Sequence, residues 1–159
     1  MLRAPIFRDD QKIVTSDLNN IGEFSRQTFD ALVANAVTSL RYYTGFTVTK
    51  TGQTQVTVAA GHYWGGGPVF VRSEATVFDM LTGGNYMPNV TKRVVAVVAY
   101  GEPIDTDIQE RSFEIDDQGN TEPLSVAMER LRYARIALVA GAESPSPQRP
   151  TLDVGVIPV

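Results

Sequence analysis

The chain of 159 residues contains no cysteine, one histidine and one tryptophan. The absence of cysteine excludes disulfides and thiolate metal sites, and it leaves the redox compartment open. A general base needs an orienting partner, and a metal needs several ligands, so the lone His62 supplies neither function by itself. Beside Tyr63 and Trp64, we expect His62 to be a packed or exposed polar aromatic residue. The sequence therefore predicts a protein that is not an enzyme and holds no cofactor or metal.

An excess of basic residues and long apolar runs are also missing. The formal net charge is −4, whereas a domain that binds nucleic acid normally shows a basic patch and a high pI. The longest apolar run, residues 94–100, is too short to span a bilayer. The first five residues lack the apolar core of a signal peptide. We therefore expect a soluble protein, made in the cytoplasm, with no nucleic-acid partner and no membrane insertion.

A chain of this length fits one domain, or one domain with an attached helix and tail, and it can bury roughly two-thirds of its unfolded surface. We predict a mixed α+β fold in three parts. Residues 1–43 form an N-terminal arm and a docking helix. Residues 44–141 form an antiparallel β domain, sandwich-like or barrel-like, and residues 142–159 form an extended, proline-rich C-terminal arm.

The predicted helix covers residues 16–40, with Ser16 as its cap and Asp17 where the helix dipole favours an anion. At about 100° per residue, its apolar side chains fall on one stripe. The stripe consists of Leu18, Ile21, Phe29, Leu32, Val33, Ala36 and Leu40. It would be covered either by the chain's own sheet or by other subunits, and the sequence leaves both readings open.

The spacing of the stripe predicts how the helix packs. Leu18, Phe29 and Leu40 recur every eleven residues, whereas a seven-residue frame would place Ser25 and Asn35 in the seam. A sustained seven-residue repeat imposes a left-handed supercoil, and an eleven-residue repeat does not. We expect a fairly straight rod rather than a leucine zipper.

Strand patterns begin at Gly45. Residues 46–49 and 55–58 alternate around turn residues and predict a hairpin, and residues 69–71 and 76–78 predict two further short strands. Residues 93–100 predict a central strand, and residues 108–115 a more exposed one. The segment 124–131 reads as helix or strand, and its continuation to residue 139 as strand.

The C-terminal arm is rich in proline and ends on apolar residues. Its prolines enforce an extended backbone, and an apolar end would leave a strand edge that pairs with a neighbour or continues into further chain. The residues expected to make contacts with other chains are Pro147, Pro150, Leu152, Val154, Val156 and Ile157.

Two other motifs suggest chemistry but have simpler explanations. Residues 65–67 are three glycines, yet a phosphate-binding loop requires a following helix, and here Pro68 leads into a strand. The acidic residues Asp105, Asp107, Glu110, Glu114, Asp116 and Asp117 match no calcium-loop spacing. We expect a hairpin turn in the first case and a solvated strand face with its turn in the second.

Two alternative functions remain open at this stage. A carbohydrate-binding β module would use Tyr63, Trp64 and Tyr100 to stack against sugars of a host surface. A hydrolase acting on surface polysaccharide would use the acidic residues between positions 105 and 117.

The order of the parts also resembles a known group of proteins. The run Thr15-Ser16-Asp17-Leu18-Asn19-Asn20, then Gly45-Phe46-Thr47-Val48, then Val56-Thr57-Val58-Ala59-Ala60-Gly61 is similar to the start of structural proteins of tailed bacteriophages. Residues 136–144, followed by prolines at 145, 147 and 150, look like the same chains. The closest resemblance is to N-terminal attachment modules of baseplate, tail-fibre and fibre-adaptor proteins.

This resemblance implies a virion protein at the tail tip, assembled in the host cytoplasm. Such a protein attaches fibres or receptor-binding proteins to the baseplate, commonly as a trimer of identical chains. Its implied partners are copies of itself and other tail, baseplate or fibre proteins.

Overall fold

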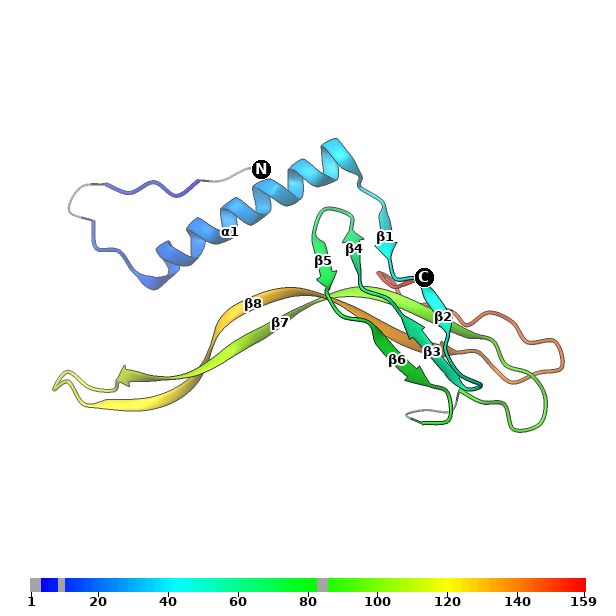
Figure 1. Ribbon diagram of the computed structural model, residues 1–159. Coiled ribbons are helices and arrows are strands. Elements are labelled where there is room, and N and C mark those ends of the chain that lie inside the picture. The colour runs from blue at the N-terminus through cyan, green and yellow to red at the C-terminus, as the bar shows by residue number, and fades with distance from the viewer. Residues whose placement is uncertain (1–3, 9–10, 83–85) are drawn as a thin grey trace.

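The computed structural model describes residues 4–8, 11–82 and 86–159. One N-terminal helix is followed by two β-sheets that are mostly antiparallel, so the predicted α+β class is confirmed. Residues 1–3 and 9–10 of the predicted N-terminal arm lie outside the described residues. The helix and a long β-hairpin project from the sheets in the same direction, one above the other (Figure 1).

The helix α1 (Thr15–Leu32) continues into a π-helical segment, η1 (Val33–Val37). Its cap is Val14 rather than the predicted Ser16, because the Asp17 carboxylate, in the third helical position, accepts the Val14 N–H at 3.0 Å. The helix ends at Val37 rather than at residue 40, since Thr38 adopts an extended backbone. Leu40 therefore lies beyond the helix, and the stripe is shorter than predicted.

The larger sheet has the order β1-β4-β5-β8-β7-β9. Its strands are β1 (Arg41–Gly45), β4 (Gly61–Gly65), β5 (Val69–Arg72), β7 (Val95–Glu114), β8 (Thr121–Ala140) and β9 (Ile157–Pro158). All neighbours are antiparallel except β5 and β8, which meet in parallel at Val71 and Tyr133. The strand β1 begins before residue 44, where we placed the start of the β domain.

The smaller sheet has the order β2-β3-β6, with β2 (Val48–Lys50), β3 (Gln55–Val58) and β6 (Thr76–Asp79). The predicted hairpin of residues 46–58 is confirmed as the pair β2 and β3, although Phe46 itself lies outside β2. The buried core contains residues from both sheets and from the turn between β1 and β2: Phe46, Val58, Tyr63, Ala99, Ala134 and Ile136.

The strands β7 and β8 form one long ribbon of 20 residues each. At about 3.3 Å per residue, each strand is roughly 65 Å long. The prediction of two separate strands, 93–100 and 108–115, was wrong because one register joins them, from Val95 opposite Ala140 to Glu114 opposite Thr121, and it skips only Asp107 in β7. The same pairing settles the ambiguous segment 124–131 as strand. Only Asp107 departs from regular strand geometry within β7, with φ of 52°.

Candidate docking surface

The apolar stripe of α1 faces solvent. No residue of α1 is buried, and the exposed fractions are 58% for Leu18, 56% for Phe29 and 59% for Leu32. Ile21, Ala36 and Leu40 are also exposed, whereas Val33 is buried. Six of the seven predicted docking residues therefore lie on the surface. Four of them belong to α1, namely Leu18, Ile21, Phe29 and Leu32.

Polar contacts hold α1 to the rest of the chain. Asp30 binds the Arg132 guanidinium of β8 through two hydrogen bonds of 2.5 and 2.7 Å. This hydrogen bonding raises the pKa of Arg132 above its usual range, against the opposing effect of burial. The side chains are partly exposed, at 30% for Arg132 and 19% for Asp30, so the pair fixes the position of the helix more than it adds stability.

The glycine turn between β4 and β5 supports the end of the helix. Gly65 donates its N–H to Pro68 O at 2.8 Å, which confirms the predicted tight turn, and a strand follows it. Gly67 has φ of 145°, and a Cβ at this position would lie 3.1 Å from Asp30 O. A side chain would therefore push the helix away, which explains why glycine is required here.

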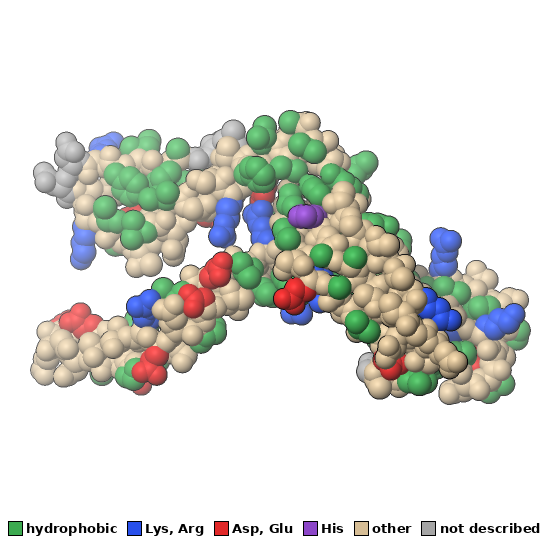
Figure 2. Space-filling view, in the orientation of Figure 1, with side chains coloured by type: hydrophobic (Ala, Val, Ile, Leu, Met, Phe, Trp, Pro, Cys, Tyr) green, Lys and Arg blue, Asp and Glu red, His purple; other side chains and the backbone are tan. Residues whose placement is uncertain are grey.

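The polar side of α1 faces the ribbon. A cleft between them is lined by Leu18, Asn19, Gly22, Glu23 and Arg26 of the helix and by Asp105, Met128 and Arg130 of the ribbon, among others. Since Leu18 also lines this cleft, the ribbon approaches the stripe at its N-terminal end, whereas Phe29 and Leu32 lie outside the cleft. Hydrophobic side chains are visible along the helix and the N-terminal arm in the space-filling view (Figure 2).

The N-terminal arm lies along the helix and reaches the stripe at Ile21. Ala4 and Pro5 approach Ile21 and Phe24, and Phe24 is half-buried. Ile6 remains 82% exposed. The arm thus adds its own apolar surface beside the stripe, which our sequence analysis missed because this short segment shows no helical or strand periodicity.

The C-terminal arm packs against β7 of its own chain. Ile157 and Pro158 pair with Ala99 and Val98 of β7 in the same chain, and Val159 donates its N–H to Val97 O at 3.0 Å. Within the single chain, Ile157 thus pairs with the edge of its own β7, and the expected contacts of this arm with other chains stay a prediction. Leu152 and Val156 line a pocket against β7, and Pro147 and Pro150 are half-buried. Among the six predicted contact residues, Val154 is the most exposed, at 94%.

Glu143 anchors the start of this arm. Its carboxylate accepts the backbone N–H groups of Asn89, Thr91 and Val90 at 3.0, 2.6 and 2.6 Å. Arg93 lies 3.8 Å away. These hydrogen bonds, led by that from Asn89, lower the pKa of Glu143 to about 2.

The Glu143 contact predicts a loss of stability in acid. The ordinary pKa of 4.5 falls to about 2 on folding, so the ionised carboxylate stabilises the fold above pH 4.5, and this contribution declines as the pH falls toward 2. We expect Glu143→Gln to lower the free energy of unfolding at pH 7, with the difference from wild type shrinking below pH 4.5. Urea denaturation across this range, with Glu110→Gln on the ribbon as control, measures it. A difference that does not change with pH would contradict the assignment.

The residues considered for catalysis do not converge. His62 is exposed and lies beside Trp64, with ring centroids 5.8 Å apart. Asp105 is paired with Arg130, whose hydrogen bond lowers the pKa of Asp105. Asp116 accepts hydrogen bonds from Gln118 and Asn120 within the ribbon's turn. Within the described ranges, no group of three histidine, cysteine or acidic residues could hold a metal ion.

The aromatic residues of the carbohydrate alternative are largely occupied. Tyr63 is 2% exposed, and its hydroxyl donates to Gly155 O at 2.6 Å. Trp64 stacks on Tyr42, with centroids 4.6 Å apart and an interplanar angle of 11°. Tyr100 is half-buried beside the pocket under the C-terminal arm. Tyr63 is thus unavailable as a stacking surface, and one face of Trp64 is already covered.

Comparison with known proteins gives no further identification. No protein-family model matches the sequence, and no curated protein and no solved structure is significantly similar to it. Within the described residues, no helix is both long enough and apolar enough to cross a membrane.

Proposed function

We propose that this chain is a non-enzymatic structural subunit that assembles with copies of itself through the apolar stripe of α1. The observation that carries the proposal is the exposure of Leu18, Phe29 and Leu32 on a helix that the rest of the chain holds by its polar side. Several exposed apolar side chains on one side of a helix are typical of protein interaction sites. Isolated exposed side chains would need no such explanation.

The fixed position of α1 favours association through the apolar stripe. The Asp30–Arg132 pair and the glycine turn fix one end of α1, so the stripe is presented on a positioned rod. Full burial of a leucine or phenylalanine contributes about 1.5–3 kcal/mol, and these side chains retain only about half of their surface for a partner. Since association costs roughly 4–15 kcal/mol, the four exposed stripe residues need the adjacent Ile6 and Val14 of the arm to form a stable interface.

We further propose that the assembly is part of a bacteriophage tail tip, where it attaches fibres or receptor-binding proteins to the baseplate. This part rests on the resemblance of residues 15–20, 45–48, 56–61 and 136–150 to such modules. A trimer would let each helix contact two others. Mass spectrometry of purified phage particles from the source culture tests the location, since the chain should remain with intact tails. Its absence from the particles would refute this part alone.

Disulfide trapping tests the helix contact directly. The natural chain has no cysteine, so Phe29→Cys introduces a single thiol on the stripe. We expect mild oxidation to give dimers of covalently linked chains that disappear on reduction. The matched control Gln27→Cys places the thiol on the opposite side of α1 and should stay monomeric on a denaturing gel. Equal dimer yields from both variants would contradict docking through the stripe.

A further inference from the structure

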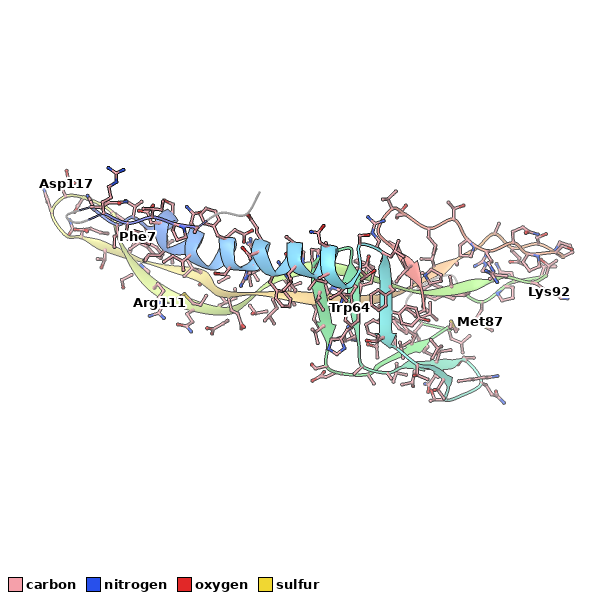
Figure 3. The ribbon with its side chains drawn as sticks, turned by 90° about the horizontal axis from the view of Figure 1, so that it is seen from above. Phe7, Trp64, Met87, Lys92, Arg111 and Asp117 are labelled. Atoms are coloured by element: carbon pink, nitrogen blue, oxygen red, sulfur yellow. The ribbon has the colours of Figure 1, made fainter. Side chains whose placement is uncertain are left out.

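The long hairpin is the most acidic part of the chain, and exposed basic residues lie at the opposite end of the molecule. The outer ribbon, which we define as residues 104–131, holds eight carboxylates and two guanidinium groups, a formal charge of −6, while the whole chain carries −4. The rest of the chain therefore carries +2, distributed over the helix, both sheets and the opposite end. Asp117 lies at one end of the long axis and Lys92 at the other (Figure 3). Acidic side chains follow the ribbon, and separate lysine and arginine side chains are visible at the opposite end and below the helix (Figure 2).

The outer ribbon lacks the support that a sheet gives. In the described part of the chain, its two strands pair only with each other, since β5 meets β8 only at Tyr133 and β9 meets β7 only at Val98 and Ala99. A two-stranded ribbon is marginally stable in water by itself. The ribbon also exposes apolar side chains, namely Ile108, Phe113, Ile115, Leu124 and Met128. These features indicate that its surface is covered in the assembled state.

The opposite end combines positive charge with exposed apolar side chains. Lys92 and Ser144 exchange backbone hydrogen bonds of 3.3 and 2.9 Å, which joins the loop before β7 to the C-terminal arm. Exposed Arg149 belongs to the same arm, where the Gln148 backbone packs against Gly141. Glu143 is already bound by three backbone amides and lies near Arg93. Val90 is 89% exposed and Met87 41%.

We propose that the acidic tip of the outer ribbon docks on this basic end of a second copy, head to tail. The contact would place Glu114 and Asp117 against Lys92 and Arg149, with Ile115 against Val90. Charge selects the second copy's basic end, because a ribbon of −6 repels another ribbon as well as nucleic acid and anionic lipid. A contact between two different patches builds a row or a ring of subunits. This head-to-tail contact does not involve the α1 stripe, so the failure of one proposed contact would leave the other unaffected.

A charge-exchange experiment tests the proposal. One variant, Glu114→Lys with Asp117→Lys, places lysines at the tip and reduces the formal charge of the outer ribbon from −6 to −2, and the other, Lys92→Glu with Arg149→Glu, places carboxylates at the opposite end. Asp116 is left unchanged because it holds the turn. We expect each variant alone to lose at least tenfold in head-to-tail association at low salt, measured by sedimentation velocity. An equal mixture should recover it, because the tip of each variant then meets an end of opposite charge.

The equal mixture also shows whether the two variants are folded, because misfolded chains would not regain head-to-tail association when they are mixed. Rising salt should weaken association of the wild type and of the mixture alike. Self-association of either variant at the wild-type level, or a mixture that stays dissociated, would overturn the proposal. If α1-dependent oligomers persist in both variants while no head-to-tail species forms in the wild type, this inference fails and the proposed helix contact is unaffected.

Discussion

The variant Leu32→Asp is expected to lower the association constant of the native assembly by roughly 30-fold or more. The leucine is 59% exposed in the single chain, so the substitution leaves the fold intact. In an assembly formed through the stripe, the new carboxylate would be buried without a partner, at a cost of at least about 2 kcal/mol. Analytical ultracentrifugation over a concentration series measures the shift from oligomer to monomer.

The control for this variant is Gln27→Asp, which adds the same charge on the opposite side of α1. Gln27 donates to Glu23 at 3.0 Å on the exposed surface, so the control should cost only a few tenths of a kcal/mol in helix stability. Its association constant should match that of the wild type. If both variants dissociate equally, net charge rather than the stripe controls assembly.

The variant Phe46→Ala is expected to reduce the free energy of unfolding by about 3–5 kcal/mol. Phe46 is 1% exposed and is one of the largest fully buried side chains of the core. Its backbone is held at φ of 51°, and its N–H donates to Ala60 O at 3.1 Å. Removing the ring would leave a cavity beside Gly61, where the backbones approach too closely to move inward. Urea denaturation measures the loss.

Phe113→Ala is the matched control, because Phe113 is 42% exposed on the outer ribbon. The same atoms are deleted there without opening a cavity, so a change below about 1 kcal/mol is expected. Similar losses for both variants would contradict the position of the core between the two sheets.

The sequence predicted the elements whose signals are local. The helix was evident from the spacing of Leu18, Phe29 and Leu32, and the β2–β3 hairpin from alternation around a turn. The helix end was misplaced because residues 41–45 pair with β4, and this long-range pairing ends the helix despite the apolar Leu40. The position of Phe46 was missed because a positive φ at a residue other than glycine has no pattern in the sequence.

The ribbon and the C-terminal arm show why the candidate surfaces were predicted only in part. Segments 93–100 and 108–115 differ in polarity, and only the pairing with β8 shows that they form one strand. The apolar end of the chain was correctly identified as a pairing strand, but its partner, β7 of the same chain, lies about 60 residues earlier and carries no local signal. The stripe is exposed because Arg132 binds the side of α1 that carries Asp30. This contact joins residues that are 102 positions apart in the sequence.

The native mass of the wild-type chain in solution tests the central claim most directly. Light scattering coupled to gel filtration at micromolar concentration should give a multiple of 17.4 kDa, and Leu32→Asp should reduce that mass while Gln27→Asp preserves it. A wild-type mass of 17.4 kDa at every concentration, with the α1 stripe still open to solvent, would contradict the account.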